Sequence, residues 1–173
     1  MTALLTIRTA RREELPELYP LVERAVAAMT RGGNPQWDRD YPAPAHYAAD
    51  QARGELYLAF TPSGALAGAA CINTDEAPQY APLPWSVPGR AVVIHRMAVD
   101  PTYQRHGVGR AFFAFAQELG RAWGAGSIRV DTYSLNAPML ALIRSLGYLP
   151  VGEVHFDRPG RPLPFLCFEK PLP

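Results

Sequence analysis

Residues 99–110 read Val-Asp-Pro-Thr-Tyr-Gln-Arg-His-Gly-Val-Gly-Arg, a strand end followed by two glycines, Gly107 and Gly109, that open a helix. The first amides of a helix have no intrahelical acceptor, and the helix dipole adds positive potential there. Because glycine has no Cβ atom, an anion can approach this backbone closely. Arg105 and Arg110 can form paired hydrogen bonds with phosphate oxygens. The stretch predicts a pyrophosphate site; a glycine-containing turn before an ordinary core helix is the alternative.

Two other known phosphate-binding motifs do not match the sequence. A nucleotide-triphosphate loop needs the spacing Gly-x-x-x-x-Gly-Lys-Ser/Thr, which the chain lacks. A dinucleotide fingerprint needs a third glycine at the position of Phe112. The residues predicted to bind the anion are Gln104, Arg105, His106, Gly107, Val108, Gly109 and Arg110.

The composition is that of an ordinary globular protein. Hydrophobic residues make up 48% and charged residues 19% of the 173 residues, and the net charge is +1, so nothing draws the chain toward nucleic acid or an anionic membrane. No apolar run approaches the roughly 18 residues of a membrane span, and the start of the chain lacks the layout of a signal peptide, so we expect a cytoplasmic protein. Cys71 and Cys167 are expected to be reduced core thiols, since both lie in apolar, strand-like stretches. No metal site is predicted.

Hydrophobic periodicity predicts a single domain over residues 1–173. Apolar residues recur at helical spacing in some segments and form short β-branched runs in others. The expected strands cover residues 4–9, 56–60, 66–73, 92–99, 128–133, 151–156 and 164–169, and the expected helices cover residues 15–29, 44–53, 108–122 and 136–146. The order β-α-α-β-β-β-α-β-α-β-β predicts an α/β fold in which helices cover both faces of a mixed sheet.

Three motifs in order resemble those of the GNAT superfamily of N-acetyltransferases. Gln-x-x-Gly-x-Gly after a strand and before a long helix is similar to the coenzyme A motif of that family. The segments 131–136 and 146–148 are similar to its second conserved block, and His-Arg-Met-Ala-Val-Asp-Pro at 95–101 is typical of one bacterial branch. The resemblance covers about residues 90–150. It implies a splayed central sheet and transfer of an acetyl group from acetyl-CoA to a primary amine, by direct attack in a ternary complex.

The resemblance also implies roles for backbone groups. The strand 92–99 would separate from the strand 128–133, and the pantetheine arm of coenzyme A would pair with backbone of Met97, Ala98 and Val99. The Val99 amide is the candidate donor to the thioester oxygen, an interaction worth about 2.7–4 kcal/mol in other enzymes. Asn136 is expected to cap the helix 136–146 and, by resemblance, to contact the pantetheine arm.

Deprotonating the amine is the larger of the two proton transfers. An amine with a lysine-like pKa near 10.4 lies about 3.4 units above pH 7, which corresponds to roughly 4.6 kcal/mol. His95 is the first candidate for the base, since strand alternation would put its side chain on the face of Met97 and Val99. A strand histidine paired with a neighbour is the alternative. Asp131, Glu76 and Asp75 are weaker candidates.

The leaving thiolate lacks the family's usual proton donor. Members of the family often carry a tyrosine seven residues after the position of Asn136, where this chain has Ile143. An alkyl thiol with a pKa near 8.5 lies only about 1.5 units above pH 7, so at most about 2 kcal/mol is at stake. Tyr133, Ser134 or a water molecule is expected to supply the proton.

The acceptor site is expected in proline-shaped loops that carry aromatic residues. Trp37, Tyr41, Tyr80 and Trp85 are the candidates, with Asp38, because aromatic rings beside a carboxylate suit an ammonium group. The same rings could instead pin the loops to the core. The acceptor is expected to be a small-molecule or peptide amine, and the protein a monomer or homodimer. A non-catalytic acyl-CoA sensor and a general nucleotide- or phosphate-binding module are the competing functions.

Overall fold

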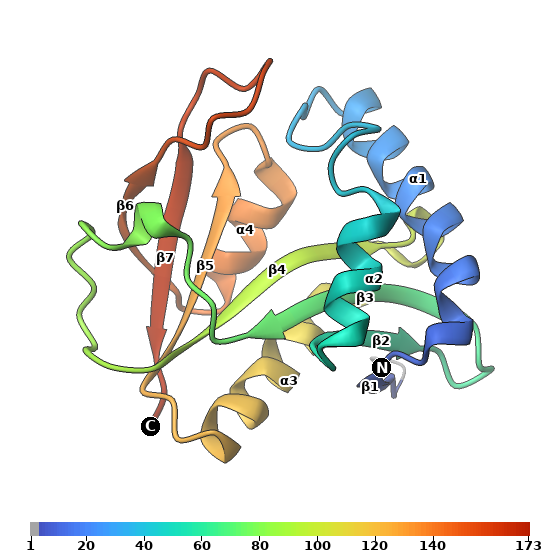
Figure 1. Ribbon diagram of the computed structural model, residues 1–173, viewed down its shortest axis with the longest axis horizontal. Helices are drawn as coiled ribbons and strands as arrows, with labels where there is room; N and C mark the ends of the chain where they lie inside the picture. Colours follow the sequence, from blue (N-terminus) through green and yellow to red (C-terminus); the bar gives the residue numbers. More distant parts are fainter. Residues whose placement is uncertain (1–3) are drawn as a thin grey trace.

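The computed structural model describes residues 4–173, which form one seven-stranded sheet in the order β1-β2-β3-β4-β5-β7-β6 (Figure 1). Neighbouring strands are antiparallel except for the parallel pair β4–β5. The strands are β1 (Thr6–Thr9), β2 (Leu56–Phe60), β3 (Leu66–Asn73), β4 (Ala91–Val99), β5 (Ser127–Tyr133), β6 (Leu149–Val154) and β7 (Phe165–Pro171). The helices are α1 (Leu15–Arg31), α2 (Pro44–Ala52), α3 (Val108–Ala122) and α4 (Ala137–Ser145), with short 3-10 helices η1 (Arg12–Glu14), η2 (Pro78–Tyr80) and η3 (Pro101–Tyr103).

The mixed α/β fold and all eleven predicted elements are confirmed. The differences lie at boundaries: β1 starts two residues later than expected and β6 starts two residues earlier. The three 3-10 helices were not predicted, since a single turn is too short to show a period. Asn136 caps α4 as expected, because its side chain accepts from the Met139 amide (3.3 Å).

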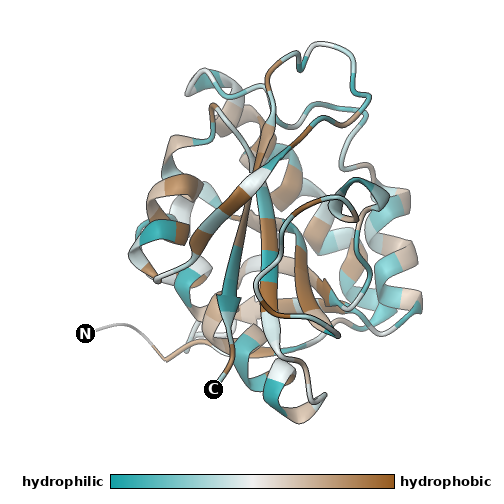
Figure 2. Cartoon of the chain, turned by 90° about the vertical axis from the view of Figure 1, so that its left-hand side faces the viewer, coloured by the Kyte–Doolittle hydropathy of each residue, from teal (hydrophilic) through white to brown (hydrophobic). Residues whose placement is uncertain are grey.

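Two helical layers enclose the sheet. Helices α3 and α4 cover one face, where Phe112 and Phe113 are fully buried. Helices α1 and α2 cover the other face over β2 and β3, and beyond them the η2 segment covers the β5–β7 end (Figure 1). Figure 2, seen from the β6 side, shows hydrophobic and hydrophilic residues alternating along the nearer strands, where successive side chains point to opposite faces of the sheet. None of the helices within residues 4–173 has the length and hydropathy of a membrane span.

Both cysteines are free and fully buried. Burial raises the pKa of Cys71 and of Cys167 to about 12, so each stays a neutral thiol. This confirms the expectation of reduced core thiols.

Strands β4 and β5 pair over only three residues each. Ala91–Val93 align with Ser127–Arg129, and no register continues beyond them. Strand β4 then follows β3 while β5 follows β7, so the two strands diverge (Figure 1). The predicted splay between these strands is therefore present, and it leaves part of β4 without a neighbour on one side.

A β-bulge interrupts β4 within this unpaired part. Cys71 pairs with His95 and Ala69 with Ala98, so Arg96 and Met97 lie opposite a single residue. Arg96 adopts φ 47°, an uncommon value for a residue with a side chain. The extra residue breaks the alternation that the sequence analysis assumed.

The bulge corrects the predicted orientation of His95. Met97 and Val99 pack in the core beneath α3, whereas the His95 ring lies on the α2 side of the sheet and bonds to Asn73. The expectation that His95 shares the face of Met97 and Val99 was wrong, because strict alternation holds only in a regular strand.

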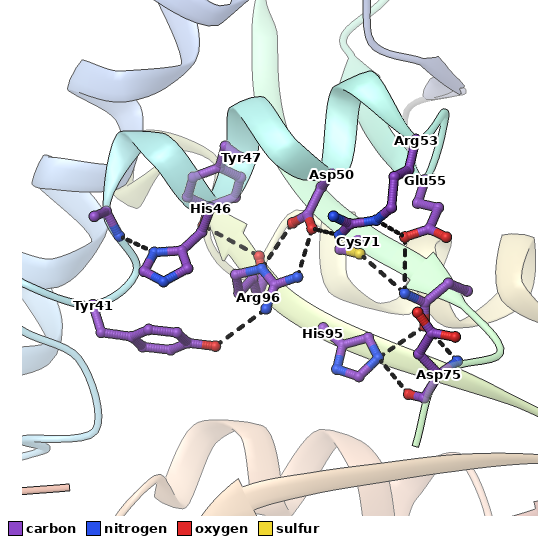
Figure 3. A network of polar contacts seen from close by, with 12 residues as sticks. Tyr41, His46, Tyr47, Asp50, Arg53, Glu55, Cys71, Asp75, His95 and Arg96 are labelled. Carbon is purple, nitrogen blue, oxygen red and sulfur yellow. Dashed lines mark hydrogen bonds and ion pairs between the residues drawn. The ribbon is translucent and has the colours of Figure 1, made fainter. Parts of the chain in front are cut away.

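A buried ion pair holds the bulge against α2 (Figure 3). The Arg96 guanidinium donates to both oxygens of Asp50, at 2.8 and 2.7 Å, and Asp50 is 1% exposed. The Tyr47 hydroxyl donates to the Arg96 carbonyl (3.3 Å). These bonds fix a backbone conformation that Arg96 would otherwise rarely adopt.

Replacing Asp50 with alanine should therefore destabilise the protein strongly. Asp50→Ala leaves the Arg96 guanidinium buried without its carboxylate, which is expected to lower the free energy of unfolding by about 3–5 kcal/mol in urea denaturation. The matched control is Glu118→Ala, which breaks the exposed Arg121–Glu118 pair and should cost less than about 1 kcal/mol. Equal losses for the two variants would contradict a structural role for the Asp50 pair.

Candidate active site

A cavity of about 950 Å³ occupies the gap between β4 and β5. The start of α3 and the side of α4 line one half, which we call the donor half. His95, Asp131, Tyr41 and Arg158 line the other, which we call the acceptor half. The cavity therefore reaches both faces of the sheet through the place where β4 and β5 part.

The donor half ends at backbone amides without partners. Gly107, with φ 85°, is the N-cap of α3, and the first amide to bond back to it is that of Ala111 (2.9 Å). Across residues 4–173 no acceptor is found for the amides of Val108, Gly109 and Arg110. The predicted anion-binding geometry is present at this helix start.

Gly109 also has a packing role that the sequence did not reveal. A Cβ atom there would lie 2.9 Å from Cδ2 of Leu142 on α4. The missing side chain therefore lets α3 begin directly against α4, beside the unpaired amides.

The Val99 amide faces the gap. The Asp100 amide donates to the Ala67 carbonyl (3.0 Å), which makes Val99–Gly68 the neighbouring pair that exchanges no ladder bonds. The N–H and C=O of Val99 therefore point away from β3, toward the space that β5 has left. The Val99 N–H therefore points into the gap, and its role as the donor to the thioester oxygen stays a prediction.

His95 lies in the acceptor half, and among the described residues only one of its ring nitrogens has a hydrogen-bond partner. Its Nε2 lies 2.9 Å from Oδ1 of Asn73 and 3.1 Å from the carbonyl oxygen of Asp75 (Figure 3). Both partners are acceptors, so Nε2 carries the hydrogen and the lone pair is on Nδ1. Burial and, secondly, the neighbouring Arg96 lower the pKa of His95 to about 4, so the ring is neutral at pH 7.

Asp131 contributes the only carboxylate among the described residues that line the cavity. Its Oδ2 accepts from the Tyr80 hydroxyl at 2.5 Å, and burial raises the pKa of this carboxyl above its usual range. The other two weak candidates serve elsewhere, since Glu76 pairs with Arg129 (2.6 Å) and Asp75 offers only its carbonyl to His95. The sequence ranked Asp131 with Glu76 and Asp75 as a weaker candidate, but of these three carboxylates only Asp131 lines the cavity.

A family model described as acetyltransferase (GNAT) family matches residues 16–148. The chain belongs to the GNAT family of acetyltransferases. A GNAT-family acetyltransferase from Streptococcus agalactiae is 24% identical with a TM-score of 0.84, covering 98% of this chain and 96% of its own. One from Listeria monocytogenes is 21% identical with a TM-score of 0.75, covering 99% of each chain. The search of functionally curated proteins found no match.

A third structure shows the same fold with its cofactor. The yncA protein of Salmonella typhimurium, solved with acetyl-CoA, is 18% identical with a TM-score of 0.68, covering 98% of this chain and 94% of its own. Acetyl-CoA is the acetyl donor of the GNAT family. The unpaired amides at the start of α3 fit its diphosphate, and the free edge of β4 fits its amide-bearing pantetheine arm.

Most residues predicted to hold acetyl-CoA line the cavity of this GNAT protein. They are Met97, Ala98, Val99, Gln104, Arg105, Gly107, Val108, Gly109, Arg110 and Asn136. His106 does not line it; its ring lies at 2.8 Å from the Gln104 carbonyl. Asn136 already donates to Oε1 of Gln36 (2.7 Å), a contact across 100 residues of sequence.

The predicted aromatic acceptor residues divide into two pairs. Trp37 and Tyr41 line the cavity, whereas Tyr80 and Trp85 do not. Tyr80 is 1% exposed, and Trp85 donates to the Tyr80 carbonyl (2.9 Å) and stacks on the Arg129 guanidinium. Tyr80 and Trp85 therefore anchor their loop to the core. The prediction that these two residues contact the substrate was wrong, because neither lines the cavity.

The predicted proton donors also lie elsewhere. The Tyr133 ring packs against Phe165, its hydroxyl accepts from the Leu163 amide (3.2 Å), and it does not line the cavity. The Ser134 hydroxyl donates to the Pro164 carbonyl. Tyr103, which the sequence did not single out, is on the cavity wall.

Coenzyme A binding should depend on the absence of a side chain at position 107. Gly107→Glu is expected to abolish detectable coenzyme A binding in calorimetry, because the carboxylate would compete with the diphosphate for the amides of α3. Gly64→Glu is the matched control, since Gly64 has the same φ of 85° in the β2–β3 turn. Unchanged affinity in Gly107→Glu would refute the assigned phosphate site.

Proposed function

We propose that this GNAT protein transfers the acetyl group of acetyl-CoA to a primary amine by direct attack within a ternary complex. The observation that carries the proposal is one cavity with the α3 amides in one half and with neutral His95 and Asp131 both lining the other. Donor and acceptor can therefore meet across the β4–β5 gap without a covalent enzyme intermediate. Holding both reactants in one cavity also lowers the entropy cost of their encounter.

The chain's own groups supply the electrostatics of the reaction. Acetyl-CoA brings the thioester, and the Val99 N–H donates to the thioester oxygen as negative charge develops there. Removing a comparable donor costs other enzymes about 2.7–4 kcal/mol. Because the donor is a backbone amide held by the strand, it needs no reorganisation when charge develops.

Protons leave the amine on the acceptor side. The Asp131 carboxylate holds the ammonium group, and Nδ1 of His95 accepts one of its protons, which frees the nitrogen lone pair to attack the thioester carbon. The nitrogen loses its second proton to a water molecule as the C–S bond breaks. A histidine with a pKa of about 4 is a weak base. At neutral pH its ring is fully unprotonated, so Nδ1 is available to accept a proton. Tyr103 or water protonates the departing thiolate, since the Tyr133 hydroxyl lies outside the cavity.

A non-catalytic acyl-CoA sensor is the second candidate, favoured by Ile143 at the position of the usual tyrosine. Ile143 is fully buried in the core and offers no proton. A sensor would need the donor half of the cavity but would have no use for a histidine and a carboxylate in the acceptor half.

A thiol-release assay with acetyl-CoA and a panel of primary amines tests the proposal. We expect thiol release that depends on both acetyl-CoA and an amine. Tight coenzyme A binding without thiol release from any amine would identify a sensor. Stabilisation by ATP or NAD in place of coenzyme A would identify a different binding module.

The pH dependence should reveal whether His95 is the base. With a base pKa of about 4 and an acceptor bound as its ammonium ion, kcat/KM of the wild type should stay level from pH 6 to 8. In His95→Ala only the free amine reacts, so kcat/KM should be lowest at pH 6 and rise by up to tenfold per pH unit.

His155→Ala is the matched control, since His155 is exposed and outside the cavity lining. The groups around His95 are Asn73, Asp75, Arg96, Asp50 through Arg96, and Glu55 through Asn73. Burial lowers the pKa of Arg96, but its hydrogen bonds to Asp50 raise that pKa above its usual range, so the guanidinium keeps its charge from pH 6 to 8 and adds no step to the profile. Parallel profiles for wild type and His95→Ala would remove His95 as the base.

A further inference from the structure

The acceptor half of the cavity holds two opposite charges that do not touch. Asp131 comes from β5 and Arg158 from the connection between β6 and β7, and both line the cavity. Arg158 is near enough to lower the pKa of Asp131, yet the ion pairs found in residues 4–173 do not include the two. The open space between them can therefore admit a ligand with charges of both signs.

Arg158 is held in place by stacking and leaves its hydrogen-bond donors free. Its guanidinium carbon lies 3.8 Å from the centre of the Tyr41 ring and 5.5–5.6 Å from those of Phe156 and Phe165. Its backbone N–H donates to the Phe156 carbonyl (2.8 Å), but in the described part of the chain no acceptor is found for the guanidinium N–H groups. A stacked guanidinium has a fixed plane with free N–H edges, the arrangement that binds a carboxylate through two parallel bonds.

The neighbouring arginines, Arg96 and Arg161, already form ion pairs within the protein. Arg96 pairs with Asp50, and Arg161 donates to the carbonyls of Pro35 and Gln36 and to the Asp38 carboxylate. The guanidinium groups of Arg96 and Arg161 therefore already have hydrogen-bond acceptors within the protein. Arg158 differs from them because it points a free donor set into the cavity.

Within residues 4–173, Asp131 is not paired with a cationic side chain. Its bonded partner is the neutral Tyr80 hydroxyl, which cannot balance the charge of a partly buried carboxylate. An ammonium group in the cavity would supply that balance. Asp131 on β5 is therefore suited to bind a cation, and Arg158 in the β6–β7 connection is suited to bind an anion.

We propose that the acceptor is a free amino acid, with its ammonium group at Asp131 and its carboxylate at Arg158. This inference rests on the proposed acetyl transfer for the fate of the ammonium group, but not for the binding. The N-terminus of a peptide has no carboxylate beside its amine, so it would leave Arg158 without a partner.

The test compares matched acceptors that differ only in the carboxylate. Phenylalanine, phenylalaninamide and phenethylamine form one set, and leucine, leucinamide and isopentylamine form another. Each compound is assayed by thiol release with acetyl-CoA and by calorimetry on protein saturated with coenzyme A. We expect the amino acid to exceed its amide and its amine by about ten- to a hundredfold in kcat/KM and in affinity.

Three variants separate the two charges. Arg158→Gln should bring the ratio of amino acid to amide close to one, whereas Asp131→Asn should lower binding of all three compounds in a set. Arg12→Gln, an exposed arginine outside the cavity lining, should keep the wild-type ratio. This crossed pattern is not expected if Arg158 only packs against Tyr41.

The outcomes distinguish this inference from the proposed function. Amides and amines acetylated as well as amino acids, with no effect of Arg158→Gln on the ratio, would overturn the inference and leave acetyl transfer standing. Amino acids that bind through Arg158 but release no thiol would support the inference and overturn acetyl transfer. Absence of both binding and thiol release for every compound would overturn the inference, and acetyl transfer would be overturned with it if the panel of primary amines also released no thiol.

Discussion

Strand β4 has β5 as a neighbour only over Ala91–Val93, and the cavity exists because this pairing stops there. The two strands cannot close the gap, because β3 holds β4 along the rest of its length and β7 holds β5 from Ser127 to Tyr133. The remaining edge of β4 keeps backbone groups such as the Val99 N–H without a partner strand. Unpaired edge groups favour a ligand that carries amides of its own, so the sheet itself selects for an extended, amide-bearing donor.

The bulge at Arg96 and Met97 gives the two halves of that cavity different chemistry. One extra residue turns His95 and Arg96 toward α2 and leaves Met97 in the apolar core beneath α3. Arg96 is neutralised by Asp50, so the bulge adds a fixed backbone shape without adding a free charge. The polar groups that β4 and β5 present to the acceptor half are consequently the neutral His95 ring and the carboxylate of Asp131.

Local signals in the sequence were sufficient for the fold and for most of the residues that line the donor half of the cavity, His106 excepted. Helical and strand periods, the Asn136 cap and the glycines before α3 are all properties of a few consecutive residues. The acceptor half depends on contacts between distant segments, such as Tyr80 with Asp131 across 51 residues and Gln36 with Asn136 across 100. The sequence therefore could not separate Trp37 and Tyr41, which line the cavity, from Tyr80 and Trp85, which hold a loop. The bulge was hidden for the same reason, since its cause is the partner Asp50 on α2.

The sizes of the two proton transfers explain how a chain with Ile143 in place of a tyrosine can still carry out the proposed reaction. Protonating a thiolate with a pKa near 8.5 is worth at most about 2 kcal/mol at pH 7, whereas deprotonating an ammonium group with a pKa near 10.4 costs roughly 4.6 kcal/mol. Ile143 packs in the core on the donor side, where the smaller requirement lies. His95 and Asp131 remain on the acceptor side, where the larger one lies. A loss confined to the less demanding step lets water take over the missing role, while the more demanding step keeps its positioned groups.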